Sequence, residues 1–112
     1  MEVLETVLKA ISEKKAFDIY DYNCMELTPF MDHMIVASTR NTRQNHAVEQ
    51  NIKDRLKEQG YTGKFHVEGD GDSRWLLVDL GDIVVHLFVE EERQVYQLDR
   101  LYADVPTRHY DL

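Results

Sequence analysis

The feature that most constrains the fold is a pair of apolar runs joined by one very short turn. Residues 75–80 (WLLVDL) and 83–89 (IVVHLFV) are rich in β-branched and other apolar residues, and only Gly81-Asp82 separates them. A two-residue loop of this composition is typical of the II′ or I′ turn between adjacent antiparallel strands. The sequence therefore predicts a hairpin. Because side chains alternate along a strand, the residues expected together on one face of its first strand are Trp75, Leu77 and Asp79.

Two segments have apolar residues at helical spacing. The first covers residues 3–11, where the apolar positions form one stripe. A second helix is predicted to begin after Asn41, which suits an N-cap, with Gln44 placed to return a hydrogen bond as in a capping box. Its apolar residues recur every four positions, and Gly60 follows where a helix commonly ends. This narrow stripe indicates a helix on the outside of a sheet.

Shorter apolar or aromatic runs predict three more strands, at residues 17–22, 34–37 and 65–68. The continuous apolar run at 34–37 is typical of a strand that is buried on both faces. Three glutamates at residues 90–92 favour the start of a short helix or turn. This order of elements predicts an α+β fold, a mixed β-sheet flanked by helices.

Length and composition indicate a globular protein with a single domain over residues 1–112. Hydrophobic residues make up 43% and charged residues 30% of the chain, which are ordinary proportions for such a protein. No apolar run approaches the roughly 18 residues that cross a bilayer, and Glu2 and Glu5 stand where a secretory signal would be basic. We therefore expect a cytoplasmic protein, and the lone Cys24 agrees with a reducing compartment.

The negative charge is concentrated in the second half of the chain. The formal net charge is −8, of which −2 lies in residues 1–60 and −6 in residues 61–112. Phosphate backbones repel such a half, whereas a basic protein surface attracts it. The charge therefore predicts little direct contact with nucleic acid and favours a basic protein as the partner.

One glycine-rich stretch could carry metal chemistry. Residues 69–73 (GDGDS) place Asp70 and Asp72 close together, and paired carboxylates can hold Mg²⁺ or Ca²⁺. The pattern does not match the twelve-residue loop of an EF-hand. Because Gly, Asp and Ser dominate ordinary turns, a solvated turn is the favoured interpretation.

The hairpin offers a second candidate for metal chemistry. Asp79 and Asp82 bracket its turn, and His86 follows on the return strand. Two carboxylates and an imidazole could form a hydrolytic metal site. His86 lies within an apolar run, however, where a hydrogen-bonded strand residue is more often found than a ligand. We therefore interpret Asp82 as a turn residue and Asp79 as a capped or salt-bridged strand end.

Aromatic residues and leucines at expected surface positions favour a binding module. Trp75 opens a strand, and an acidic tail holds Tyr96, Leu98, Leu101 and Tyr102. Tyr and Trp dominate the hot spots of protein interfaces. The same residues also suit packing at the edge of the core, and the residues alone leave both interpretations open.

Residues 75–88 (WLLVDLGDIVVHLF) resemble the signature strand pair of the ribosomal silencing factors, also called the Iojap-like family. Glu92-Arg93 and residues 96–104 (YQLDRLYAD) continue the resemblance at similar spacing. The matching upstream segments are Lys14-Lys15-Ala16, Asp32 before residues 34–37, and Thr42-Arg43-Gln44. The resemblance covers nearly the whole chain.

Two positions and one loop depart from the usual pattern of that family. Tyr102 stands where members commonly have Trp, and His33 replaces a usual aromatic residue. Residues 23–30 lack the usual small and glycine-rich character. These departures bear on the details of an interface.

The resemblance implies a sheet related in shape to nucleotidyltransferases, without their catalytic motif and without a cofactor. It also implies a translational repressor, not an enzyme. Members bind the fourteenth protein of the large ribosomal subunit, block joining of the small subunit and lower translation when nutrients are scarce. Some members self-associate, so a homodimer is a further expectation.

The residues that we expect at such a docking surface are Trp75, Leu77, Tyr96, Leu98 and Leu101, with Asp79 and Asp82 at the rim. The alternative is a small metal-dependent enzyme of nucleotidyltransferase type that uses Asp70, Asp72 or Asp79. Nucleotide binding in the presence of Mg²⁺ would distinguish the two hypotheses.

Overall fold

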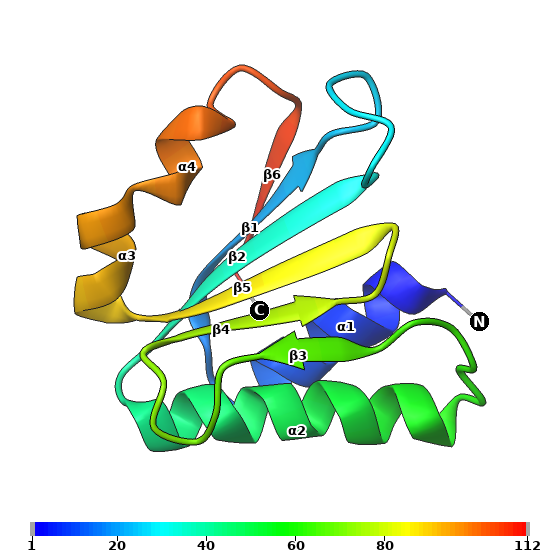
Figure 1. Cartoon of the computed structure of the whole chain (residues 1–112), viewed down its shortest axis with the longest axis vertical. Helices are drawn as coiled ribbons and strands as arrows, with labels where there is room; N and C mark the ends of the chain where they lie inside the picture. Colours follow the sequence, from blue (N-terminus) through cyan, green and yellow to red (C-terminus); the bar gives the residue numbers. More distant parts are fainter. Residues whose placement is uncertain (1, 112) are drawn as a thin grey trace.

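The structure is a computed structural model, and it describes residues 2–111. Within this range the chain forms four helices and one six-stranded sheet (Figure 1). The helices are α1 (Val3–Glu13), α2 (Thr42–Glu58), α3 (Glu90–Tyr96) and α4 (Leu98–Leu101). The strands are β1 (Phe17–Asn23), β2 (His33–Thr39), β3 (His66–Glu68), β4 (Trp75–Asp79), β5 (Ile83–Val89) and β6 (Thr107–Tyr110).

The sheet is mixed, with strand order β3-β4-β5-β2-β1-β6. Only the central pair, β2 and β5, is parallel among the described pairings, and the other neighbours are antiparallel. All of β2 except its first residue is buried, as its continuous apolar run predicts. The α+β class and the mixed sheet flanked by helices are confirmed.

The helices α1 and α2 cover one face of the sheet and form the larger core with it. Buried residues of both helices pack there on the inward-facing residues of the central strands. Two buried amides hold α2 in place. Asn51 donates to the Ala10 carbonyl at 2.8 Å, and Asn45 donates to the Leu87 carbonyl at 2.9 Å. Because a buried amide without a partner costs about 1–3 kcal/mol, these bonds fix how α2 sits on α1 and β5.

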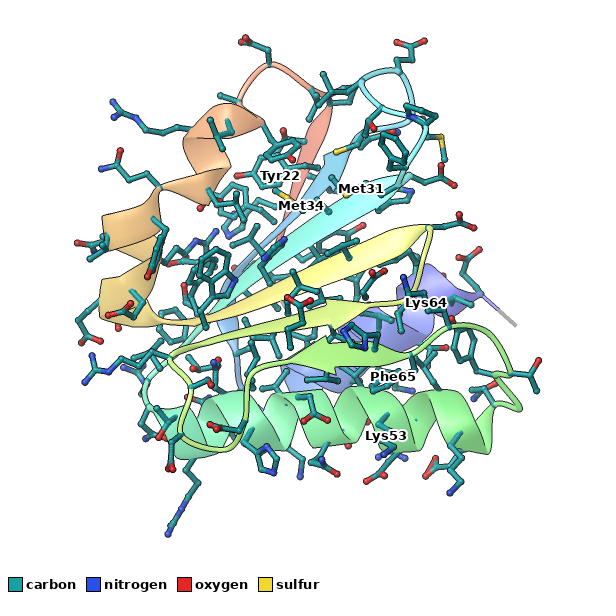
Figure 2. All side chains as sticks on the ribbon, viewed as in Figure 1. Tyr22, Met31, Met34, Lys53, Lys64 and Phe65 are labelled. Carbon is teal, nitrogen blue, oxygen red and sulfur yellow. The ribbon has the colours of Figure 1, made fainter. Side chains whose placement is uncertain are left out.

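The opposite face of the sheet carries a smaller apolar cluster, which we call the outer cluster. Tyr22, Met31 and Met34 belong to it and lie close together in Figure 2. Leu98 and Tyr102, from the short C-terminal helices and the residue after them, pack against this cluster. In Figure 1 these helices (orange) lie well away from α2. This second face is therefore covered in one part only.

The predicted turn chemistry is confirmed in detail. The Leu80 N–H donates to the Ile83 carbonyl at 2.8 Å, which closes a two-residue loop. Gly81 has a positive φ of 89°, whereas the φ of Asp82 is not positive. A positive φ at the first loop residue alone defines type II′ rather than I′.

The N-terminus of α2 differs slightly from the expected capping box. The Asn41 side chain accepts from the Gln44 N–H at 2.8 Å, as predicted. The Gln44 side chain returns to the N–H of Arg40, at 2.7 Å, instead of that of Asn41. The extended backbone of Asn41 places the preceding N–H within reach of the Gln44 amide.

The C-terminal tail contains two elements that the sequence did not predict, the short helix α4 and the strand β6. A residue with positive φ, Gln97 at 50°, separates α3 from α4. After α4 the chain returns to pair β6 with β1, with Thr107 opposite Tyr22. β6 is short and its residues are mostly exposed, so local periodicity carries little information about it. Among residues 2–111, we find no helix of the length and apolar character that a membrane span requires.

Candidate docking surface

Trp75 is the centre of an aromatic group on the outer face of the sheet. β4 alternates half-buried and buried residues, which confirms that Trp75, Leu77 and Asp79 point away from the main core. The Trp75 ring lies 4.9 Å from the Phe88 ring and 4.6 Å from the Tyr96 ring, between centroids. Strand and helix therefore both hold the indole, although it remains partly exposed.

His86 fixes the orientation of Trp75. The indole N–H of Trp75 donates to Nδ1 of His86 at 3.0 Å, so the proton of the neutral imidazole lies on Nε2. Burial lowers the pKa of His86 to about 4, because the charged form would lose its hydration. His86 is thus a hydrogen-bonded strand residue that acts as an acceptor.

A polar network joins the C-terminal helices to the sheet. Arg93 makes two hydrogen bonds to the Asp99 carboxylate, at 3.0 and 2.8 Å, and a third to Ser38 Oγ at 2.8 Å. The Tyr22 hydroxyl donates to Asp99 at 2.6 Å. Burial alone would raise the pKa of Asp99, yet the bonds from Arg93 and Tyr22 lower it below its ordinary value. Burial and the neighbouring carboxylate raise the pKa of Tyr22. We call these four residues the Arg93 network.

The Arg93 network attaches to the sheet the helices that carry Tyr96, Leu98 and Leu101, the tail residues expected at the docking surface. Tyr96 touches Trp75 and still exposes 53% of its surface. Leu98 is partly buried against the outer cluster. Leu101 exposes 75% of its surface. Tyr96 therefore adjoins Trp75, whereas Leu98 supports the surface from beneath.

The two acidic residues of the hairpin lie in different surroundings. Asp79 accepts from Lys64 Nζ at 2.9 Å and from the Gly81 N–H at 2.8 Å. The bond from Lys64, then that from Gly81, lowers the pKa of Asp79. Asp79 is therefore a salt-bridged strand end, as the sequence suggested.

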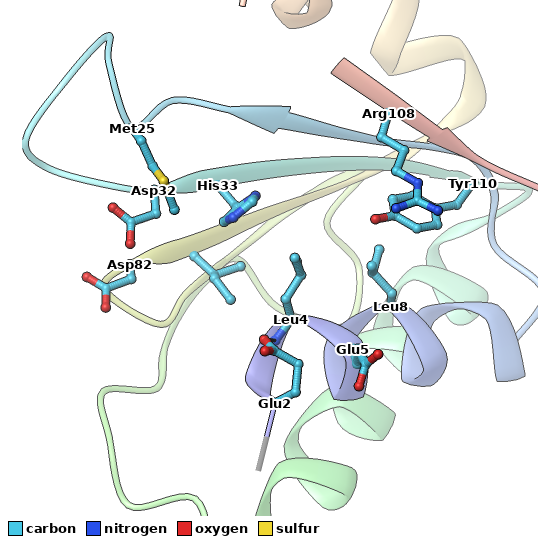
Figure 3. A pocket seen from close by; sticks show the side chains of 11 residues that line it. Glu2, Leu4, Glu5, Leu8, Met25, Asp32, His33, Asp82, Arg108 and Tyr110 are labelled. Atoms are coloured by element: carbon cyan, nitrogen blue, oxygen red, sulfur yellow. Dashed lines mark hydrogen bonds between the residues drawn. The ribbon is translucent and has the colours of Figure 1, made fainter. Parts of the chain in front are cut away.

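Asp82 does not share the surroundings of Asp79. It lines a hollow between the start of α1 and the adjoining end of the sheet (Figure 3). Asp32 and His33 line the same hollow. Nδ1 of His33 lies 2.8 Å from Oδ1 of Asp21, within hydrogen-bonding distance. The structure thus separates Asp82 from Asp79, and only Asp79 shares a face with Trp75.

The carboxylates of the alternative, enzymatic hypothesis do not meet. Asp70 accepts from the Asp72 N–H at 2.9 Å and from Ser73 Oγ at 3.2 Å, which is the geometry of a self-contained turn. This turn precedes β4, whereas Asp79 ends that strand. Across residues 2–111, no three His, Cys, Asp or Glu side chains are arranged to hold a metal ion.

The loop between β1 and β2 contributes apolar surface that the sequence analysis overlooked. Phe30 exposes 86% of its surface and Leu27 exposes 56%. The docking residues expected from the sequence do not include this segment, although large apolar residues within a loop were a signal available in the sequence.

Comparison with known proteins decides the family. The family model described as "Ribosomal silencing factor during starvation" matches residues 1–112.

The chain belongs to this ribosomal silencing factor family.

The ribosomal silencing factor of Halalkalibacterium halodurans is 34% identical over 106 residues, which cover 95% of this chain and 90% of that protein. A crystal structure of a protein from Chromobacterium violaceum superimposes with a TM-score of 0.81 at 30% identity, over 100% of this chain and 94% of that one. A mouse relative, named mitochondrial assembly of ribosomal large subunit protein 1, is 26% identical over 89% of this chain and 45% of its own length.

Membership of the silencing factor family gives the chain a ribosome-associated role in the regulation of translation. The family model and the Halalkalibacterium halodurans relative are both named for silencing of the ribosome, which is a regulatory role. The family resemblance recorded in residues 75–88 is thereby confirmed.

Proposed function

We propose that this chain represses translation by binding the large ribosomal subunit through its fourteenth protein and obstructing the small subunit. The observation that carries the proposal is the partly covered outer face, where Trp75 is held in place by His86 and Tyr96 and is still accessible. The repression is expected when nutrients are limited, in keeping with the family description, which names starvation.

The chemistry of this face suits a protein partner. Trp and Tyr dominate the central hot spots of interfaces because they bury a large area at little cost in conformational entropy. We place Trp75, Leu77 and Tyr96 at the centre of the proposed surface and Asp79 at its rim, and we include Leu101, which α4 exposes. Asp82 lines another hollow, and we therefore assign it a marginal part.

The charge of the chain supports a basic protein as the partner. Residues 61–112, with a net charge of −6, include β3–β6 and the helices α3 and α4, which carry the surface. A basic ribosomal protein attracts this half, while ribosomal RNA repels it. Direct contact with RNA is therefore expected to be slight, and no cofactor is needed. The same face offers a second copy of the chain a place to associate, in competition with the ribosome.

The first test is co-sedimentation of the purified chain with separated ribosomal subunits, followed by a subunit-joining assay. We expect binding to the large subunit alone and less joining. Trp75→Ala and Leu77→Ala are expected to weaken binding to the isolated fourteenth protein, the first by about 2 kcal/mol or more.

Val95→Ala is the matched control. Val95 exposes 71% of its surface, and it lies about 200° around α3 from Arg93, away from the sheet. Unchanged binding by Trp75→Ala and Leu77→Ala would refute the proposed surface. Failure of the chain to bind large subunits would refute the proposed function as a whole.

A further inference from the structure

A hollow of about 540 Å³ on the outer face includes Asp79 in its wall. It lies between the β1–β2 loop, the turn end of the β4–β5 hairpin and the residue that ends α4. Its principal lining residues are Leu27, Phe30, Met31, Asp79, Val84 and Tyr102. The wall is therefore mainly apolar, and its two charged residues, Asp79 and Lys64, are paired with each other.

Backbone hydrogen bonds hold the β1–β2 loop in a defined shape. The Cys24 N–H donates to the Asp32 carbonyl at 2.7 Å and closes the loop at its base. The Thr28 N–H donates to the Cys24 carbonyl at 3.1 Å, and the Asp32 N–H ties the loop to the carbonyl of Asp82 at 2.7 Å. The exposure of Phe30 and Leu27 is thus imposed by an ordered turn.

The hollow is continuous with the proposed docking surface. Val84 stands opposite Asp79 in the β4–β5 register, and Leu77 stands opposite His86. Directly opposed residues share one face of a sheet, so Val84 faces the same side as Leu77 and Trp75. A partner that covers Leu77 therefore extends over the hollow.

The size of a stable interface supports the same extension. Specific complexes bury roughly 800 Å² on each partner, which is more than the side chains of Trp75, Leu77 and Tyr96 can offer. The hollow and its two exposed loop residues, Leu27 and Phe30, add apolar surface on the same side of the sheet. Contiguous apolar surface of this kind marks an interaction site more often than a solvated one.

We propose that the β1–β2 loop and this hollow form a specificity-determining part of the docking surface, which receives an apolar side chain of the same basic ribosomal protein. An apolar occupant suits the site because the Asp79 carboxylate is engaged by Lys64 and Gly81. The inference rests on the proposed function and adds a second anchoring point to it.

The test is the affinity of Leu27→Ser, Phe30→Ser and the double variant for the isolated fourteenth protein. We expect the double variant to bind at least tenfold more weakly than the unmodified chain. Val95→Ser removes a similarly exposed apolar side chain that does not line the hollow, and we expect it to bind within twofold of the unmodified chain. All of these residues are exposed, and the thermal midpoint of each variant shows that folding is preserved.

A photo-crosslinking amino acid at position 30 supplies a readout that does not depend on affinity. We expect it to crosslink the fourteenth protein on intact large subunits. If Trp75→Ala weakens binding while the double variant does not, the loop proposal fails and the proposed function stands. If the unmodified chain does not bind that protein, both fail. If the double variant changes self-association but not binding to the fourteenth protein, the hollow serves contacts between copies of the chain, and the inference is overturned.

Discussion

At the scale of single residues, Trp75 depends on the protonation state of its neighbour. Its indole N–H needs an acceptor, and Nδ1 of His86 is one only while the imidazole is neutral. Burial keeps it neutral by lowering the pKa of His86 from 6.5 to about 4. The acceptor that orients Trp75 is therefore uncharged at physiological pH.

This lowered pKa predicts a dependence of stability on pH. In the unfolded chain His86 binds a proton as the pH falls below about 6.5, whereas in the folded chain it stays neutral until about pH 4. The unfolded state binds more protons in that window, so the free energy of unfolding decreases as the pH falls through it. The contribution of His86 is at most about 3 kcal/mol. Urea unfolding between pH 7 and pH 4 measures it.

His86→Gln is the control for this pH dependence. Glutamine offers an acceptor to the indole N–H but does not titrate. The carboxylates of the chain titrate in both proteins, so the difference between the two curves isolates His86. We expect the unmodified chain to lose more stability than the variant between pH 6.5 and pH 4. Parallel curves would show that burial does not hold the imidazole neutral.

At the scale of elements, α3 and α4 stay on the sheet through the Arg93 network. The Arg93 side chain is largely buried, and it bonds Asp99, Ser38 and the Asp18 carbonyl. Arg93→Met would leave the Asp99 carboxylate partly buried without its cation. We expect a loss of roughly 2–3 kcal/mol in the free energy of unfolding, since removing one partner strands the other charge.

Hydrogen exchange locates the effect of Arg93→Met. Amides of residues 90–104 are expected to lose more protection than those of α2. Arg100→Met is the matched control, because Arg100 bonds Gln97 at an exposed site and surface changes usually stay within about 0.5 kcal/mol. Equal effects of the two variants would contradict a special role for Arg93.

The cap of α2 gives a second prediction at this scale. Asn41→Ala removes the acceptor of the Gln44 N–H, and we expect it to cost about 1 kcal/mol of stability. Asn41→Ser keeps a capping oxygen, and its free energy of unfolding should stay within a few tenths of a kcal/mol of that of the unmodified chain. Urea denaturation of the three proteins compares them. An alanine variant as stable as the serine variant would show that the cap contributes little.

The elements that the sequence predicted are those specified by local information. The hairpin has its glycine at the one loop position that needs a positive φ, and α2 has both its cap and its terminal glycine. β6 is different, because its partner β1 lies almost at the other end of the chain. The break at Gln97 is also invisible in the sequence, since a non-glycine residue adopts a positive φ there.

The arrangement of the candidate docking residues was predictable to a similar degree. Alternation along β4 placed Trp75 and Leu77 on one face, and residue type singled out Tyr96. The contact between Trp75 and Tyr96, at 4.6 Å, depends on the course of α3 and could not be predicted locally. The separation of Asp82 from Asp79 follows from the direction of the turn, which sequence spacing does not determine.

At the scale of the whole molecule, β4 and α3, which carry Trp75 and Tyr96 of the proposed docking surface, both belong to the acidic half of the chain, whereas β6 of the same half lies at the opposite edge of the sheet. β3 and β4 form one edge of the sheet, and α3 and α4 lie across its outer face. The strand order is not sequential, because β2 lies between β5 and β1. Trp75 and its neighbours therefore lie on elements of the half of the chain that has a net charge of −6.

This arrangement predicts that charge and apolar contact act on different steps of binding. Long-range attraction raises the association rate and is screened by salt, with a Debye length of about 10 Å at 0.1 M. Buried aromatic contacts act mainly on dissociation. Raising the ionic strength from about 0.05 to about 0.5 M should therefore slow association with the fourteenth protein roughly tenfold and change dissociation far less. Trp75→Ala should do the reverse, with faster dissociation at each salt concentration. Surface plasmon resonance resolves the two rates, and an association rate that salt does not change would show that the acidic half does not guide docking.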